Sequence, residues 1–304
     1  MARSYLTELD LTPEESLAIL ADADRMKAQR KDGAHRTDLA GKHVAVYFEK
    51  PSVRTRISFT VGVHELGGQV VELTAGNTKL GHGEELEDFA RVVSGYVHLF
   101  VARVFSQQSL RDMAATATIP VINALSDERH PCQALADVMA IREKVGRIEG
   151  VKFVYVGDGN NVAASTGLLA AALGADVYVC SPDGYRLPDG IMAEAQGLKG
   201  RLTQLTDPRE VVKGADVLYT DTWISMGQEA EAEGRRKIFK DYRITEAMVA
   251  EAGPQAWVMH CLPAVREEEI EKSVMYGAQS AIWDQAENRL HAQKALMRFL
   301  MSGA

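Results

Sequence analysis

The sequence predicts an α/β protein with two doubly wound parallel-sheet domains, linked by helices, and with a site in the cleft between them. Short apolar runs alternate with amphipathic stretches along most of the chain, a pattern typical of parallel sheets flanked by helices. The alternation restarts after residues 146–150, which contain two glycines. The length of 304 residues also favours two domains over one.

The first half, residues 1–146, is predicted to hold four strands. A Thr-Pro-Glu-Glu signal beginning at Thr12 marks the start of its first helix. Residues 74–83 interrupt the alternation with three glycines and are predicted to form a mobile loop. The predicted strands are 43–48, 69–73, 98–102 and 120–123, and the predicted helices are 11–30, 52–66, 84–94, 109–117 and 130–145.

The second half, residues 147–304, repeats the pattern. Residues 228–240 are charged and interrupted by glycine, and are predicted to form a surface loop. The amphipathic stretch at about 287–303 is predicted to be a helix that packs back on the first domain. The predicted strands are 152–156, 176–180, 201–205, 215–220 and 257–261, with a short one at 280–283.

Composition narrows the possible functions. The formal net charge of −8 argues against a general nucleic-acid or anionic-membrane binder, so an anionic substrate needs a local basic pocket. No apolar run reaches transmembrane length, and no signal peptide is visible. The three cysteines are scattered and indicate a reducing compartment, the cytoplasm. The eight histidines form no recognisable ligand motif; neither a metal site nor a cofactor is expected.

Basic residues crowd one predicted helix start. Ser52 to Thr55 would form the first turn after a buried strand, where free N–H groups and the positive end of the helix dipole meet. Cations are unfavourable there by roughly 0.3–1 kcal/mol each, yet Lys50, Arg54 and Arg56 all lie near it. A bound phosphate would turn this repulsion into attraction. The alternative is three solvated basic residues.

Other polar residues follow the predicted strands, where open α/β sheets bind ligands. Those in the first half suit phosphate and carbonyl oxygens. Those in the second half, an amide, a carboxylate, a hydroxyl and a thiol, suit an amino-acid-like partner. This division indicates group transfer between two ligands. The residues are Arg103, His130 and Gln133 in the first half, and Asn161, Asp221, Ser225 and Cys261 in the second.

Five motifs in order resemble the aspartate/ornithine carbamoyltransferase family over nearly the whole chain. They are Ser-x-Arg-Thr-Arg from Ser52, His-Pro-x-Gln from His130, Asp-x-Trp-x-Ser-Met-Gly from Asp221, His-Cys-Leu-Pro from His260 and Glu-Asn-Arg-Leu-His from Glu287. The Asp221 and His260 motifs resemble the ornithine-specific members. The resemblance implies carbamoyl transfer from carbamoyl phosphate to the δ-amine of L-ornithine, giving L-citrulline and phosphate, in a homotrimer or an assembly of trimers.

The resemblance also implies which residues bind each substrate. The first domain, 1–146, would bind carbamoyl phosphate and the second, 147–304, ornithine. Arg54, Arg103, His130, Asp221 and Cys261 would be the catalytic residues. The carbamoyl phosphate residues would be Ser52, Val53, Arg54, Thr55, Lys79, Arg103, His130, Gln133, Cys261, Leu262 and Arg289, and the ornithine residues Asn161, Asp221, Ser225 and Met226.

Three other readings stay open. The acceptor could be another amine, such as putrescine or an acylated ornithine. A Gly-x-Gly turn at Gly157 mimics a dinucleotide-binding oxidoreductase, but Val162 stands where the third glycine of that motif belongs. The chain could also be a non-catalytic relative that only binds a partner, but such a relative would be expected to have lost some of these motif residues. The sequence also departs from the family at Val53, which is commonly threonine there, and at Lys79, which would act from a neighbouring subunit.

Overall fold

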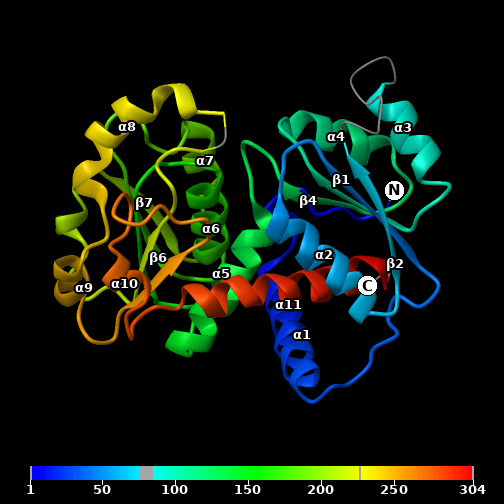
Figure 1. Cartoon of the computed structure of the whole chain (residues 1–304), viewed down its shortest axis with the longest axis horizontal. Coiled ribbons are helices and arrows are strands. Elements are labelled where there is room, and N and C mark those ends of the chain that lie inside the picture. Colours follow the sequence, from blue (N-terminus) through cyan, green and yellow to red (C-terminus); the bar gives the residue numbers. More distant parts are fainter. Residues whose placement is uncertain (1, 75–84, 226, 303–304) are drawn as a thin grey trace. The chain divides into compact units, whose positions relative to one another are not determined.

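The structure is a computed structural model that describes residues 2–74, 85–225 and 227–302 (Figure 1). The chain forms two compact units. One comprises Met1–Leu135 and Asn288–Ala304, and the other comprises Ala136–Glu287. Two helices, α5 (Pro131–Val145) and α11 (Ile282–Met301), each contain a boundary between the units.

The first unit is built on a parallel sheet of four strands in the order β2-β1-β3-β4. The chain moves outward from β1 to β2 and then returns to the other side for β3, so the strand order switches between β1 and β3. The strands are β1 (His43–Phe48), β2 (Gln69–Thr74), β3 (Leu99–Arg103) and β4 (Val121–Leu125). The helices are η1 (Glu8–Asp10), α1 (Pro13–Lys31), α2 (Val53–Glu65), α3 (Leu86–Val93) and α4 (Gln107–Thr116).

The second unit contains a parallel sheet of five strands in the order β7-β6-β5-β8-β9. Its order switches between β5 and β8. The strands are β5 (Lys152–Val156), β6 (Asp176–Cys180), β7 (Arg201–Leu205), β8 (Val217–Thr220) and β9 (Trp257–His260). The helices are α6 (Asn161–Ala172), α7 (Asp189–Glu194), η3 (Pro208–Glu210), η4 (Glu229–Glu231), α8 (Ala232–Phe239), η5 (Lys240–Tyr242), α9 (Glu246–Ala252) and α10 (Lys272–Met275).

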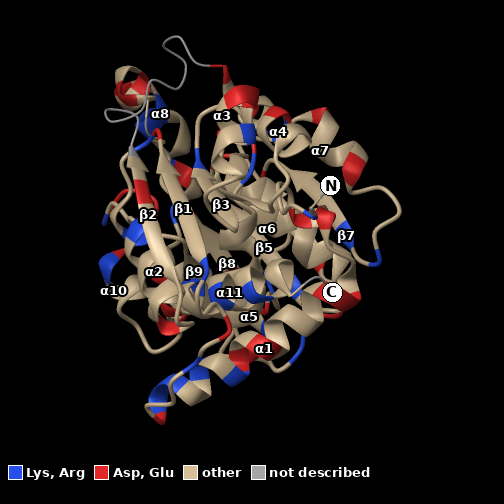
Figure 2. Cartoon of the chain, turned by 90° about the vertical axis from the view of Figure 1, so that its right-hand side faces the viewer, with Lys and Arg blue, Asp and Glu red and all other residues tan. Residues whose placement is uncertain are grey.

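Both sheets are covered by helices, which explains their nearly continuous apolar strands. All five residues of β3 and all four of β8 are buried. Helix α6 packs against β6 and β7 and is buried along almost its whole length. Helix α1, by contrast, carries charges of both signs on its exposed side (Figure 2). The predicted α/β class with two parallel sheets is confirmed.

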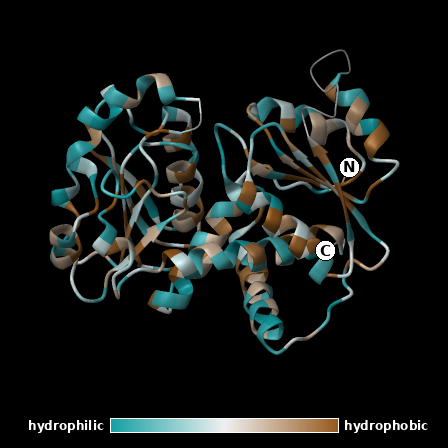
Figure 3. Cartoon of the chain, viewed as in Figure 1, coloured by the Kyte–Doolittle hydropathy of each residue, from teal (hydrophilic) through white to brown (hydrophobic). Residues whose placement is uncertain are grey.

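Two predicted elements are wrong. The stretch 228–240, predicted to be a loop, contains α8, which is largely hydrophilic (Figure 3). Its helical form is favoured because Arg235 and Phe239, four residues apart, are buried on one face. The predicted strand at 280–283 is also absent, since Ser280 forms only an isolated bridge and α11 begins at Ile282, five residues before the predicted start.

No helix in the described part of the chain is long and apolar enough to span a membrane. The predicted loop 74–83 lies almost entirely outside the described residues.

Candidate active site

Helix α2 begins at the switch point of the first sheet. Ser52 is its N-cap, in an extended conformation, and its hydroxyl accepts a hydrogen bond from the Thr55 amide at 3.3 Å. This cap leaves other first-turn N–H groups directed away from the helix, where they can bind an anion. Because β1 and β3 are the strands at which the order switches, a ligand is expected beside this turn.

Two buried guanidinium groups meet at the hydroxyl of Thr55. Arg103, the last residue of β3, donates to Thr55 Oγ1 at 3.4 Å, and Arg289 of α11 donates to the same atom at 2.9 Å. All three side chains are buried. Two like charges so close together repel each other, and a phosphate group between them would offset that repulsion.

His130 lies beside the same two cations. Burial lowers its pKa well below the usual value, and the charges of Arg289 and Arg103 lower it further. The imidazole is therefore neutral near pH 7, so it presents one donor and one acceptor nitrogen rather than two donors. Gln133 follows in the first turn of α5 and its side chain is buried. Its backbone N–H donates to the carbonyl of His130 at 3.0 Å.

The other cations of the helix start differ in surroundings. Lys50 is buried, pairs with Asp127 and lies 4.4 Å from the centre of the Phe105 ring. Arg56 lies over the Phe48 ring at 5.0 Å and within 3.9 Å of Glu72. The expectation that both crowd the helix start to attract an anion is therefore too broad, because their charges have partners elsewhere.

Two predicted phosphate residues, Val53 and Arg54, are exposed in the first turn of α2. An exposed arginine there is solvated, so its charge is available to an incoming ligand.

Cys132, in the first turn of α5, is buried, and its thiol donates to the carbonyl of Asn123 at 3.3 Å. Burial raises the pKa of this thiol to about 12, although Arg289 acts in the opposite direction. It is therefore unreactive at neutral pH.

In the second unit, Asp221 gathers hydrogen bonds at the β5/β8 switch point. Its Oδ1 accepts from the Thr222 amide at 2.8 Å and from the Cys261 thiol at 2.9 Å. Its Oδ2 accepts from the Asn160 side-chain amide at 2.8 Å. The carboxylate is thus held in one orientation from three sides, ready to accept from a cationic or neutral amine.

The sequence pattern favours Asn161 as a site residue, whereas in the structure the neighbouring Asn160 contacts Asp221. Asn160 is the N-cap of α6, and its Oδ1 accepts from the amides of Val162 and Ala163 at 3.0 and 3.1 Å. Its amide nitrogen is left to donate to Asp221. Asn161 lies next to it as the first residue of α6 and is half-buried. The N-cap preference for asparagine was the signal that could have distinguished the two.

Arg235 of α8 was also missed. Its side chain is only 4% exposed; Nε donates to the Trp223 carbonyl at 2.5 Å, and a terminal nitrogen pairs with Asp158. The guanidinium carbon lies 4.7 Å from the centre of the Tyr185 ring. Burial raises the pKa of Asp158 to about 6, an effect that Arg235 opposes. Arg235 thereby joins the loops after β5, β6 and β8.

The His-Cys-Leu-Pro segment is held in place by hydrogen bonds of His260. Its Nδ1 accepts from the Leu262 amide at 2.8 Å, so the proton is on Nε2, which donates to Glu269 at 3.1 Å. Leu262 adopts a φ of 61°, a left-handed conformation that is costly for a leucine. The His260 contact compensates for that strain and fixes the direction of the Leu262 backbone.

One group of side chains in the described residues has the composition of a metal site. Ligand atoms of Asp221, His260 and Cys261 lie within 4.8 Å of one another. Both ring nitrogens of His260 already form the hydrogen bonds to Leu262 and Glu269, so a metal would have to displace one of them.

Among the predicted ornithine residues, Ser225 is half-buried and its backbone amide donates to the side chain of Gln228 at 3.0 Å. Lys79 and Met226 lie outside the described residues.

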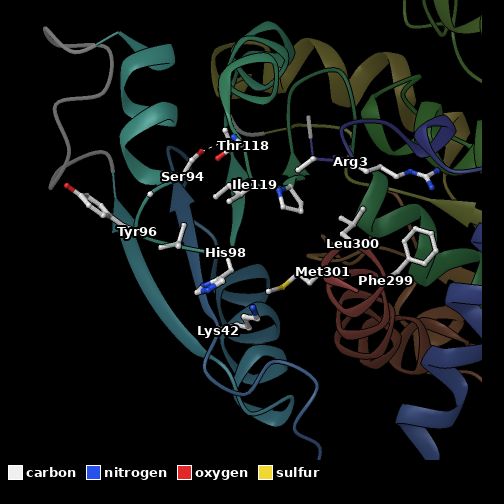
Figure 4. A pocket seen from close by; sticks show the side chains of 14 residues that line it. Arg3, Lys42, Ser94, Tyr96, His98, Thr118, Ile119, Phe299, Leu300 and Met301 are labelled. Atoms are coloured by element: carbon white, nitrogen blue, oxygen red, sulfur yellow. Dashed lines mark hydrogen bonds between the residues drawn. The ribbon is translucent and has the colours of Figure 1, made fainter. Parts of the chain in front are cut away.

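A pocket of about 630 Å³ lies elsewhere in the first unit (Figure 4). Lys42, His98 and Pro120, which line it, each immediately precede a strand. The pocket therefore lies at the amino ends of the strands. Ligands of parallel sheets bind at the carboxyl ends, so this pocket is separate from the Thr55 cluster.

These features define a class: two-unit α/β proteins with a cluster of buried cations at the switch point of one sheet and a hydrogen-bonded carboxylate at that of the other. Comparison with known proteins gives the family. The model for the carbamoyl-P binding domain of aspartate/ornithine carbamoyltransferase matches residues 3–143, and the model for its Asp/Orn binding domain matches 149–300. The chain belongs to the aspartate/ornithine carbamoyltransferase family, and the resemblance of its motifs to that family is confirmed.

Individual relatives are similar over their whole lengths. An ornithine carbamoyltransferase of Parafrankia sp. is 50% identical over 305 residues, covering 99% of this chain and 96% of that protein. The anabolic ornithine carbamoyltransferase of Pyrococcus furiosus is 49% identical, covering 99% of this chain and 97% of that protein. The solved structure of ornithine carbamoyltransferase from Pyrococcus furiosus has a TM-score of 0.96 at 48% identity, covering 100% of this chain and 98% of that one. The prediction of a carbamoyltransferase enzyme is confirmed.

Proposed function

We propose that the chain transfers the carbamoyl group of carbamoyl phosphate to the δ-amine of L-ornithine, giving L-citrulline and phosphate. The observation that carries this proposal is the convergence of Arg103 and Arg289 on Thr55, an anion site, in a chain whose other unit presents Asp221 with Cys261 and Asn160. Relatives about half identical to the chain carry the same activity in their names. Residues 1–146, joined by Leu262 and Arg289 from the second half of the chain, bind carbamoyl phosphate, and residues 147–304 bind ornithine.

The carbamoyl phosphate residues divide by the part of the ligand that they bind. The helix start, Ser52 to Thr55, holds the phosphate through backbone N–H groups, two hydroxyls and Arg54. Because the backbone supplies the contact at Val53, its departure from threonine has little effect. Arg103 bridges phosphate and carbonyl oxygen, and Arg289 supports both. The carbamoyl group is held by His130 at its oxygen, and by Gln133 and the backbone carbonyl of Leu262 at its amide.

The reaction proceeds by direct attack through a tetrahedral intermediate, without a covalent enzyme intermediate. As the amine adds, negative charge grows on the carbonyl oxygen, where Arg103, Thr55 and neutral His130 donate. A neutral imidazole suits this role because its single donor nitrogen can face the oxygen. Collapse breaks the bond to phosphate, which leaves with the proton that the attacking nitrogen loses and whose charge the helix start balances. Much of the rate gain comes from positioning the two reactants.

The amine must lose a proton before it attacks, since a lysine-like amine is mostly protonated near pH 7. Asp221 accepts a hydrogen bond from the incoming ammonium, orients it and helps its proton leave to the solvent. The thiol of Cys261 donates to Oδ1 of the same carboxylate at 2.9 Å. Asn161, Ser225 and Met226 bind the α-amino acid end. This end is what distinguishes ornithine from other primary amines.

The runner-up function is carbamoyl transfer to another amine, putrescine or an acylated ornithine. A panel of these amines with carbamoyl phosphate tests the choice, with ureido product and phosphate measured together. We expect ornithine to have the highest kcat/KM, with one phosphate released per citrulline. If putrescine is the better acceptor, the substrate assignment is wrong. Absence of turnover with every amine would indicate a binding-only relative.

The assembly is proposed to be a homotrimer, or a larger assembly of trimers, that works in the cytoplasm. Two apolar side chains of α2 support association, since Val53 is 74% and Ile57 is 56% exposed. The three cysteines are free, as expected in a reducing compartment. Lys79 would act from a neighbouring subunit. Light scattering should give a mass that is a multiple of three chains, and a monomer that is fully active would contradict the proposal.

A further inference from the structure

The residues just before η1, together with Glu8, form an additional edge to the first sheet. Residues 5–8 are called the N-terminal segment here. Its Tyr5 amide donates to the carbonyl of Val121 at 2.8 Å, and the Asn123 amide donates to the carbonyl of Tyr5 at 2.9 Å. Tyr5 thereby forms a parallel bridge with Ile122 of β4. The segment thus runs alongside β4 toward its carboxyl end, where the chain turns into His130.

A buried polar network joins this segment to the turn before His130. The Leu6 carbonyl accepts from Asn123 at 2.9 Å and from the Gln107 side chain at 3.2 Å. Gln107 in turn accepts from the hydroxyl of Ser126 at 2.6 Å. The turn itself is closed by two hydrogen bonds, from the Ser126 amide to the Arg129 carbonyl at 2.8 Å and from the Arg129 amide to Ser126 Oγ at 3.0 Å.

The segment also contacts both neighbours of His130. Glu8 pairs with Arg129 at 2.5 Å, and their side chains are 0% and 4% exposed. On the other side, the hydroxyl of Tyr5 donates to the carbonyl of Pro131 at 3.4 Å. A buried charge is costly unless it is paired, so Glu8 and Arg129 hold each other in place. His130 therefore lies between two residues that the N-terminal segment fixes.

We propose that the N-terminal segment is a positioning device for His130, with the Glu8–Arg129 ion pair as its main contact. The inference rests on the proposed function, which places His130 on the carbamoyl oxygen. Displacement of a binding group by about 1 Å can cost two orders of magnitude in rate. The pair has a second effect: it neutralises Arg129, so that the positive charge around His130 is supplied by Arg103 and Arg289, which face the ligand.

Glu8→Asp is the decisive variant, because it keeps the buried charge but draws the carboxylate back by one methylene. Glu15→Asp is the matched control, since Glu15 forms an exposed ion pair with Arg3 in the same region. Val97→Ala is a stability control, at the amino ends of the same strands. Three quantities are measured, first on the unchanged chain and then on each variant. They are the affinity for carbamoyl phosphate alone by calorimetry, the Tm by thermal unfolding, and kcat and the KM for ornithine by steady-state kinetics.

We expect Glu8→Asp to weaken carbamoyl phosphate binding by at least about fivefold and to lower kcat, with the KM for ornithine within about twofold. Both controls should leave carbamoyl phosphate binding unchanged, even if Val97→Ala lowers Tm as much as Glu8→Asp does. Glu8→Gln should show a larger loss if it folds. A Glu8→Asp protein with lower Tm and unchanged carbamoyl phosphate affinity would overturn the inference. An unchanged chain that binds no carbamoyl phosphate would instead overturn the proposed function.

Discussion

At the scale of single residues, the anion site depends on geometry as much as on charge. Arg289 donates to Thr55 through one terminal nitrogen at 2.9 Å, and its planar guanidinium holds its N–H donors in a fixed fork. A lysine at this position would keep the charge but offer only a point donor. The chain contains a matched control on the same helix, Arg298, whose guanidinium pairs with Asp22 and Asp38.

Arg289→Lys should weaken carbamoyl phosphate binding by about tenfold to a hundredfold, because lysine replaces the planar fork of guanidinium donors with a point charge. Arg298→Lys should change it by less than about twofold while lowering stability slightly. Isothermal titration with carbamoyl phosphate measures both. Equal affinities for the two variants would place Arg289 outside the anion site.

A histidine on the same helix gives a prediction on pH. His291 is buried, and burial together with the charges of Lys294 and Lys27 lowers its pKa to about 3. The folded chain therefore keeps this imidazole neutral, while the unfolded chain takes up a proton below its usual pKa of about 6.5. The stability that follows is present above about pH 6.5 and is lost as the pH falls toward 3.

His291→Gln should therefore reduce the acid sensitivity of the fold. Between about pH 8 and about pH 5, the free energy of unfolding should fall by up to about 2 kcal/mol less in the variant than in the unchanged chain. His35→Gln is the control, because His35 is exposed. Denaturant unfolding at the two pH values gives the difference. Identical pH dependence in the variant and the unchanged chain would show that His291 does not titrate on unfolding.

At the scale of elements, α8 supports the loops that carry the proposed ornithine residues. Its Arg235 reaches the Trp223 carbonyl and Asp158, and these belong to the loops that carry Asp221 and Asn160. The buried guanidinium also lies against two aromatic rings, those of Tyr185 and Phe239. A helix outside the sheet thus fixes two loops through the contacts of a single side chain, Arg235.

Arg235→Lys should raise the KM for ornithine by about tenfold or more, because an ammonium group cannot hold both loops at once. Carbamoyl phosphate affinity should stay within about twofold, since Arg235 belongs to the other unit. Arg236→Lys is the control: Arg236 is half exposed and pairs with Glu268 at the surface. A variant that raises both Michaelis constants equally would show a general loss of structure instead.

The sequence was sufficient for most elements but not for α8. Buried parallel strands such as β1 and β5 could be predicted to their end residues, because apolar runs between helices have few other interpretations. Helix α8 is short, charged and contains Gly234, so its composition is also that of a surface loop. Its helical form depends on the burial of Arg235 against partners far away in the chain, and single-sequence patterns do not contain that information.

The same limit applied within the site. Arg103, His130, Gln133, Asp221 and Cys261 were predicted because each follows a strand. The roles of these residues stay predictions, but the structure does bring Cys261 against Asp221 and His130 beside Arg103. Arg235 and the Glu8 pair were not predictable, because they act through residues more than seventy positions away.

At the scale of the whole molecule, we propose that each compact unit binds mainly one substrate, apart from the contact of the Leu262 carbonyl with carbamoyl phosphate. The Thr55 cluster is formed by residues of the first unit alone, and the Asp221 cluster by residues of the second. Each cluster lies where the strand order of its own sheet switches. Loss of one cluster should therefore leave binding at the other intact.

Calorimetric titration of carbamoyl phosphate into Asp221→Asn and Arg103→Gln tests this division most directly. The account predicts that Asp221→Asn loses turnover but binds carbamoyl phosphate within about twofold of the unchanged chain, whereas Arg103→Gln binds it at least about tenfold more weakly. Undiminished binding by Arg103→Gln, or an equal loss in Asp221→Asn, would contradict it.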